Sequence, residues 1–196
     1  MINLWDQKAK WYDFARQIPV VRALYQTELR LLQSLIPEQP IDTHLDIGTG
    51  TGSTLAIFHR SRMLILSDRS SRMLRIAIQR HPGPAIVLDL EQGLPFQNQS
   101  FDFLTAVGVF EYLREPEFVL RELYRVAKVQ AFLLFTTTPI GWFSLLRYFT
   151  GNRPRMYREQ AVQRMLRSAG WSKIDQRKCK TQDQWLCQKK SEKTPI

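Results

Sequence analysis

Cysteine and histidine are scarce in this chain of 196 residues, which holds two cysteines and three histidines. The two cysteines, Cys179 and Cys187, are too few for a disulfide framework, and no paired cysteine and histidine spacing predicts a zinc site. No Ser-His-Asp or Cys-His arrangement predicts nucleophilic catalysis. The composition therefore predicts a reduced, cytoplasmic location and an activity that needs neither a metal ion nor a thiol.

Long apolar runs are also missing. No run approaches the roughly 18 residues that a membrane-spanning helix requires. The first ten residues carry an aspartate, a tryptophan and two lysines, so we expect no signal-peptide core there. A hydrophobic content of 44% excludes a disordered chain, and the length suits one domain over residues 1–196.

Acidic residues are few in the last part of the chain. Residues 140–196 hold thirteen basic and four acidic residues, so nine of the ten net positive charges lie there. Such an excess is typical of proteins that meet an acidic substrate, nucleic acid or an anionic membrane surface. A solvated basic face explains the same composition.

Short apolar segments alternate with segments of helical periodicity along the whole chain. This alternation predicts an α/β fold, a Rossmann-like, doubly wound and mostly parallel sheet of seven strands with helices on both faces. Residues 1–40 form an expected N-terminal helical segment, whose helix ends before Pro37. The expected strands are residues 43–47, 63–66, 85–88, 103–107, 131–135, 171–178 and 184–189, and the expected helices are residues 21–36, 53–60, 70–79, 116–126, 142–149 and 159–169.

A glycine-rich run, residues 45–52, follows the first expected strand and reads Leu-Asp-Ile-Gly-Thr-Gly-Thr-Gly. Glycines at this place let the backbone bend sharply and let a ligand lie against bare main chain. A dinucleotide site of the pattern G-x-G-x-x-G would need glycine where Ser53 stands. Asp46, two residues before the first glycine, suits a ligand with a positive group, such as the ammonium of an amino-acid moiety. A glycine-rich turn without a ligand is the alternative.

A second acidic residue, Asp68, closes the second expected strand 18 residues after Gly50. In doubly wound folds an acid at about this distance accepts hydrogen bonds from ribose hydroxyls. A helix N-cap is the alternative role for Asp68. A third acid, Asp89, follows the third strand, and Ser100-Phe101-Asp102 introduces the fourth.

These pieces, in this order, resemble the class I S-adenosylmethionine (SAM) dependent methyltransferases, with the glycine run matching the family's motif I. The resemblance extends over most of the chain, and Asp68-Arg69-Ser70 with Met73 matches the family's second motif. It implies SAM as cofactor, with Asp89 and Leu90 facing the adenine. The implied cofactor-binding residues are Asp46, Gly48, Thr49, Gly50, Gly52, Asp68, Arg69, Met73, Asp89, Leu90 and Val107.

Methyl transfer from SAM is an in-line displacement, so the protein mainly has to align the acceptor with the methyl group. An oxygen or carbon acceptor would still benefit from a base. The candidates by motif position are Tyr112, Glu111 and Tyr12. The family often has histidine where Tyr112 stands, which argues against a strong general base at this corner.

The resemblance is to small-molecule methyltransferases such as those of ubiquinone and menaquinone biosynthesis, and residues 142–171 are faintly similar to magnesium-protoporphyrin methyltransferase. We expect residues 140–160 to cover the acceptor, because aromatic residues such as Trp142 alternate there with arginines. The same segment predicts peripheral contact with an anionic membrane. Two alternatives remain open: an RNA methyltransferase that uses the basic region, and a non-catalytic SAM-binding subunit. The acceptor and the oligomeric state are not specified by the sequence.

Overall fold

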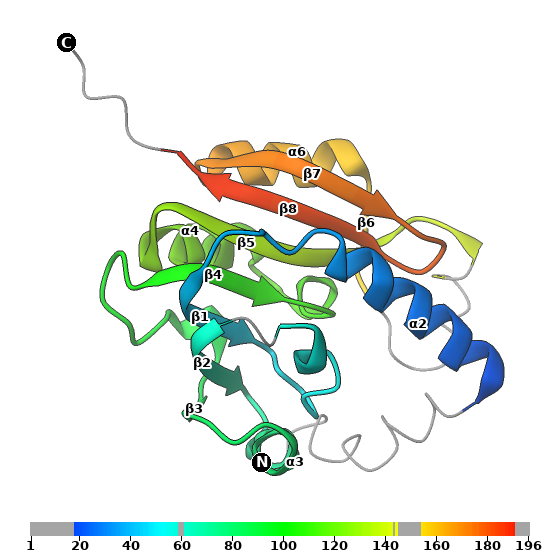
Figure 1. Cartoon of the computed structure of the whole chain (residues 1–196). Coiled ribbons are helices and arrows are strands. Elements are labelled where there is room, and N and C mark those ends of the chain that lie inside the picture. Colours follow the sequence, from blue (N-terminus) through cyan, green and yellow to red (C-terminus); the bar gives the residue numbers. More distant parts are fainter. Residues whose placement is uncertain (1–17, 59–60, 143, 145–153, 191–196) are drawn as a thin grey trace.

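One sheet organises the protein, and the computed structural model describes it through residues 18–58, 61–142, 144 and 154–190. Seven strands lie in the order β3, β2, β1, β4, β5, β8 and β7, and a short eighth strand, β6, pairs with β5 (Figure 1). The strands are β1 (Ile41–Ile47), β2 (Ser61–Asp68), β3 (Ala85–Val87), β4 (Phe101–Ala106), β5 (Ala127–Pro139), β6 (Met156–Tyr157), β7 (Trp171–Lys178) and β8 (Asp183–Lys189).

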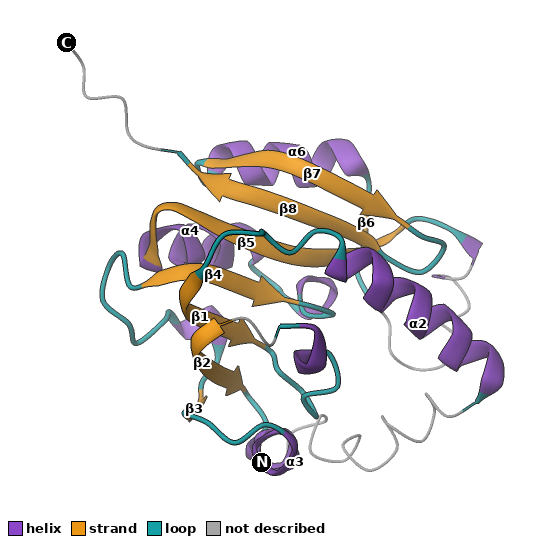
Figure 2. Cartoon of the chain, in the orientation of Figure 1, coloured by secondary structure: helices purple, strands orange, loops and turns teal. Residues whose placement is uncertain are grey.

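Strands β3, β2, β1, β4 and β5 run parallel, whereas β8 is antiparallel to both β5 and β7. The carboxyl ends of β1, β2 and β4 therefore meet at one edge of the sheet, where doubly wound folds place their ligands. The predicted mostly parallel sheet is confirmed. The helices, drawn in purple in Figure 2, are α2 (Pro19–Gln33), α3 (Ser71–Arg80), α4 (Pro116–Val126) and α6 (Glu159–Ser168), with 3-10 turns η1 (Leu55–Ile57), η2 (Leu90–Gln92) and η3 (Phe110–Tyr112).

Two apolar clusters cover the two faces of the sheet. Successive side chains of a strand point to opposite faces, so adjacent residues join different clusters. In β4, Phe103 packs in the cluster that contains residues of α3, whereas Leu104 packs in the cluster that contains residues of α4 and α6. In β8, Leu186 joins the first cluster and Trp185 the second. Helices therefore cover both faces, as predicted.

One local prediction is wrong, and one short strand has no counterpart among the predicted elements. The helix expected over residues 53–60 is only the 3-10 turn η1 among the residues described there. Leu55 and Phe58 are both buried, and this spacing of three positions between buried side chains matches the tighter 3-10 repeat in this short connection. Strand β6 was not predicted, because two residues carry no readable period and its pairing with Thr138 and Pro139 depends on a distant segment.

Several predicted features lie outside the described residues. Residues 1–17, which include Tyr12, are among them, as is the helix expected over residues 142–149 apart from Trp142 and Ser144. None of the helices in the part of the chain that the structure describes has the length and apolar content to cross a lipid bilayer.

Candidate cofactor site

The three glycines after β1 serve different purposes, although all three have positive φ angles. A Cβ atom added to Gly48 would lie 2.4 Å from Val109 Cγ2, so this glycine permits close packing against the segment after β4. A Cβ atom on Gly52 would lie 3.2 Å from Ala77, on α3. Among the described residues, a Cβ atom on Gly50 would meet only the Gly48 carbonyl oxygen, at 4.0 Å. Packing thus accounts for Gly48 and Gly52, whereas the open side of Gly50 leaves room for a ligand.

Asp68 ties the glycine loop to the start of α3. The Gly50 N–H donates to Asp68 Oδ2 over 2.8 Å, and the Ser70 N–H donates to Asp68 Oδ1 over 2.8 Å. Ser70, rather than Asp68, is the N-cap of α3, because its hydroxyl oxygen accepts the Met73 N–H. Burial raises the pKa of Asp68. Each carboxylate oxygen can accept a second hydrogen bond, so the predicted ribose contact is compatible with this geometry.

Asp46 is a buried carboxylate with one unsatisfied oxygen. Its side chain is 2% exposed at the carboxyl end of β1. Oδ1 accepts a hydrogen bond from the Thr105 hydroxyl on β4, while Oδ2 has no hydrogen-bond partner among the described residues. Burial raises the pKa of Asp46 to about 6, and the neighbouring Asp68 also raises it. An unpaired buried carboxylate oxygen is costly, and a cationic group above the loop would satisfy it.

Thr49 fixes the loop from inside. Its hydroxyl donates to the Asp46 carbonyl oxygen over 3.2 Å and accepts the Ser67 N–H over 3.1 Å. The Ser67 hydroxyl donates to the same Asp46 carbonyl over 2.9 Å. These contacts join β1 to β2 next to the glycine run, and cofactor binding by Thr49 stays a prediction.

The predicted adenine side lies at η2. Asp89 precedes this turn and its Oδ1 accepts the Glu91 N–H over 3.1 Å, while Leu90 is buried in the core. Glu91 Oε1 in turn accepts the N–H groups of Arg114 and Glu115, the two residues before α4. The turn that carries Asp89 and Leu90 is therefore anchored to the N-terminus of α4.

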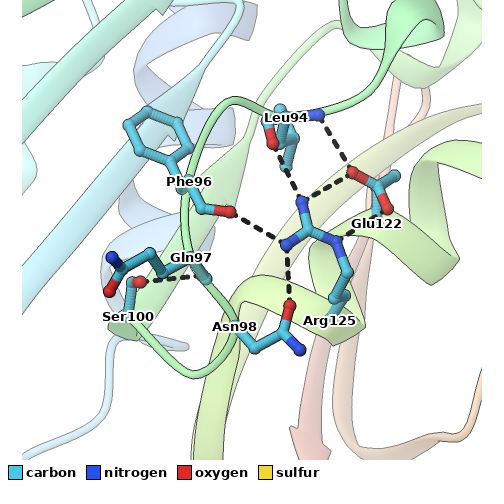
Figure 3. A network of polar contacts seen from close by, with 7 residues as sticks. All are labelled: Leu94, Phe96, Gln97, Asn98, Ser100, Glu122 and Arg125. Carbon is cyan, nitrogen blue, oxygen red and sulfur yellow. Dashed lines mark hydrogen bonds and ion pairs between the residues drawn. The ribbon is translucent and has the colours of Figure 1, made fainter.

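Arg125 of α4 holds the loop that follows η2. Figure 3 shows its guanidinium surrounded by acceptors: the carbonyls of Leu94 and Phe96, each at 2.9 Å, and Asn98 Oδ1 at 2.8 Å. Glu122 completes the network by accepting from Arg125 and from the Leu94 N–H. The Arg125 contact lowers the pKa of Glu122. This arginine replaces hydrogen bonds that a loop without regular structure cannot supply itself.

The corner after β4 holds two of the three predicted base candidates, Glu111 and Tyr112, on η3. Glu111 is 4% exposed, and its Oε1 accepts the Thr138 hydroxyl over 3.3 Å. The Glu111 carbonyl accepts the Arg155 N–H over 2.8 Å. The segment leading into β6 therefore closes onto this corner, next to the Val109 side chain that packs on Gly48.

The remaining predicted residues occupy varied positions. Arg69 is exposed, Val107 is half-buried, and Met73 is buried on α3. In the expected cover, Trp142 is 78% exposed. Tyr157 is instead part of the core, with its hydroxyl donating to the Phe110 carbonyl over 3.0 Å. The described residues add no observation in favour of membrane contact, which stays a prediction.

Sequence reasoning missed the buried hydroxyl groups that support the site. Thr105 binds Asp46, Thr138 binds Glu111, and Thr136 accepts the Gly108 N–H over 2.8 Å. Thr105 lies within a predicted strand, and Thr136 and Thr138 follow the strand expected over residues 131–135. A threonine there is also a common β-strand residue, so its sequence position alone did not identify a partner.

Comparison of the sequence with known proteins identifies methyltransferase relatives. Residues 45–135 match the family model described as a methyltransferase domain. A malonyl-[acyl-carrier protein] O-methyltransferase from Herminiimonas arsenicoxydans is 31% identical over 189 residues, 92% of this chain and 70% of the relative. The enzyme of the same name from Marinomonas sp. is 32% identical over 155 residues, 71% of this chain, and the match spans only 57% of that relative's length.

Solved structures share the fold. A Haloferax volcanii chain from a complex with the Trm112 methyltransferase activator has a TM-score of 0.81 at 16% identity, covering 97% of this chain and 100% of its own. Magnesium protoporphyrin IX methyltransferase from Synechocystis, solved with bound S-adenosylhomocysteine (SAH), has a TM-score of 0.72 at 17% identity, covering 93% and 95%. The chain belongs to the class I SAM-dependent methyltransferases, and SAM is the cofactor of this family.

Proposed function

We propose that this protein transfers the methyl group of SAM to a small-molecule acceptor. The observation that carries the proposal is the pairing of an open Gly50 with the unsatisfied Asp46 Oδ2 at the carboxyl edge of a parallel sheet. Both features fit SAM: the loop gives its amino-acid part bare main chain, and Asp46 gives its ammonium a counter-charge. Bound SAM supplies an already activated methyl group on a sulfonium sulfur.

The chain's own residues then have to hold two molecules in line and exclude water. Asp68 and Asp89 are the residues that we assign to the ribose and adenine side. Glu111 is the group that we assign to the acceptor side, because it is a buried carboxylate on the segment that also carries Val109. Orientation of this kind accounts for about 7–11 kcal/mol of the barrier in favourable cases.

The acceptor class depends on whether a base is needed. A carboxylate acceptor, such as the malonyl group named in two relatives, is already ionised and needs none. A phenol or an enol carbon loses a proton, and Glu111 is then the residue placed to take it. A basic acceptor side would suit an anionic molecule, since residues 140–196 hold most of the net positive charge. We therefore favour an anionic, lipophilic acceptor.

Two other functions remain as outcomes of the same experiment. RNA methylation is suggested by the basic region, but Tyr157, an aromatic residue within that region, is buried in the core and is not available to stack on a base. A non-catalytic SAM-binding subunit would keep Asp46 and Gly50 but turn over no acceptor.

The test is a calorimetric titration with SAH followed by transfer assays with labelled SAM. Acceptors should include a malonyl thioester on acyl-carrier protein, a demethylated quinone, a porphyrin and RNA. Binding of SAH with transfer to one of the small molecules supports the proposal. Binding without transfer to any of them indicates a binding subunit, and absence of SAH binding overturns the proposal.

A Glu111→Gln variant then separates the acceptor classes. If the acceptor loses a proton, kcat should fall by about 100-fold or more, the usual range for removing a general base. If the acceptor is a carboxylate, kcat should change little. Unchanged SAH affinity in the variant would show that the cofactor end of the site is intact.

A further inference from the structure

A chain of hydrogen bonds runs through the core to the Asp46 carboxylate. His44, on β1, is fully buried between Phe58 and Phe103, with ring centroids at 5.4 Å and 4.7 Å. Its Nδ1 lies 3.1 Å from Ser61 Oγ and its Nε2 lies 2.8 Å from Thr105 Oγ1. Thr105 is the β4 partner of Asp46 in the sheet register and also contacts its carboxylate.

The direction of this chain follows from proton counting. The Thr105 hydroxyl has one proton, which it donates to Asp46 Oδ1. Thr105 Oγ1 must therefore accept at its contact with His44, so His44 carries its proton on Nε2. His44 Nδ1 then has only a lone pair and accepts from the Ser61 hydroxyl. Each hydrogen bond is thus donated in the direction of Asp46, because an ionised carboxylate can only accept.

The hydrogen-bonded side chains that lead to Asp46 carry no charge. Burial lowers the pKa of His44 to about 3, so the imidazole carries no charge near neutral pH. The charged group that acts on Asp46 is Asp68 on β2, and His44 reaches the carboxylate only through Thr105. Oδ1 accepts a hydrogen bond from Thr105, whereas Oδ2 has no hydrogen-bond partner among the described residues and keeps its full accepting capacity for a ligand.

We propose that His44, acting through Thr105, is a positioning residue that holds the Asp46 carboxylate with Oδ2 presented to the ammonium group of the cofactor. This inference rests on the proposed function, because it assigns the cofactor's ammonium to Asp46. Its prediction is specific: disturbing the chain weakens ligands that carry the ammonium and spares ligands that lack it.

The first test compares two ligands on one substitution. Thr105→Val removes the hydroxyl with little change of shape. We expect SAH affinity to fall by about tenfold to a hundredfold, the range for a hydrogen bond to a charged group. Methylthioadenosine has the same adenosine and lacks the amino-acid part, so its affinity should stay within about threefold. Thr105→Ser keeps a hydroxyl and should restore SAH binding.

Thr43→Val is the matched control. It deletes a threonine hydroxyl from the other end of β1, where that hydroxyl lies 2.7 Å from Asp102 Oδ2 and 3.0 Å from the Ser100 carbonyl oxygen, the two acceptors available to its single proton. It should leave both affinities unchanged. Wild-type SAH affinity in Thr105→Val, or equal loss of SAH and methylthioadenosine, would overturn the inference while the proposed function stands. Failure of the wild-type protein to bind either compound would overturn both.

The second test asks whether His44 acts through Thr105. His44→Phe should weaken SAH binding, and the double variant with Thr105→Val should bind no more weakly than Thr105→Val alone, since coupled residues are not additive. Additive losses would show that His44 acts independently. In the ligand-free wild-type protein, nitrogen NMR of His44 should show the Nε2–H tautomer. An Nδ1–H tautomer would contradict the direction of the chain without any substitution.

Discussion

The substitution Gly50→Ala should affect the stability of the ligand-free protein and its affinity for SAH to different extents. An alanine at Gly48 would place its Cβ 2.4 Å from Val109, and one at Gly52 would lie 3.2 Å from Ala77, so both changes strain the protein itself. At Gly50 the nearest atom to a new Cβ is the Gly48 carbonyl oxygen at 4.0 Å. The substitution therefore disturbs the ligand-free protein only through its φ angle of +58°.

The two effects differ in size. A left-handed backbone costs an L-residue about 1–2 kcal/mol. The smaller entropy of the unfolded alanine chain offsets about 0.4–1 kcal/mol of this. A net loss of about 1 kcal/mol lowers Tm by about 2–4 °C in a chain of this size. A methyl group forced into space that SAH occupies should instead weaken binding by about tenfold to a hundredfold, as overpacking costs about 1–3 kcal/mol.

The assay is calorimetric titration with SAH beside thermal unfolding without ligand. Gly93→Ala is the control, because Gly93 also has a positive φ angle, +90°, and its Cβ would make an ordinary contact with Glu122 at 3.5 Å. Gly93→Ala should lower Tm and keep SAH affinity. If Gly50→Ala binds SAH within about threefold of the wild-type protein, the cofactor does not lie against Gly50 and the reasoning fails.

Three further predictions concern charge. The pKa of Asp46 rises from 3.8 to about 6 on folding, so the folded state keeps a proton that the unfolded state has lost between these values. The free energy of unfolding should therefore fall by up to about 3 kcal/mol as pH rises through this interval. Urea unfolding at several pH values should show this fall in the wild-type protein and not in the Asp46→Asn variant. Arg125→Met leaves the carbonyls of Leu94 and Phe96, in the loop after η2, without their hydrogen-bond donor. This change should lower the free energy of unfolding, measured in urea, by about 1–2 kcal/mol. An unchanged unfolding midpoint would contradict the network of Figure 3. Replacing Arg153, Arg155 and Arg158 with Gln should reduce turnover and salt-sensitive binding to anionic vesicles; if turnover, vesicle binding and SAH affinity all stay unchanged, the cover hypothesis fails.

The order of motifs made the cofactor end of the site predictable. Parallel strands present their carboxyl ends at one edge, so Asp46 and Asp68, each at a strand end, had to come together. Their side chains do meet the same loop, Asp68 through the Gly50 N–H. Helix α6 was also predicted, because Gly170 ends a strongly periodic segment there, and the two last strands were predicted over residues 171–178 and 184–189 without their antiparallel pairing.

The supporting contacts were not predictable, because they depend on register. Thr105 reaches Asp46 only because β1 and β4 pair with those two residues opposite each other. His44 lies in a predicted strand and is buried, but its link to Asp46 requires the position of Thr105. The 3-10 turn at Leu55 likewise depends on how much chain is left to reach β2, which a hydrophobic period does not report.

The placement of β8 has a consequence for biosynthesis. This strand is the last of the sheet in sequence, yet it lies between β5 and β7. While the ribosome makes the chain, β1, β2 and β4 can pair early, whereas β5 has no neighbour on its far side until residues 183–189 emerge. The nascent protein therefore carries an open edge on β5 from residue 139 until residue 183 has been added, and that edge can recruit other chains. Translation that stalls before Asp183 should yield aggregates in which strands β1, β2 and β4 are already paired.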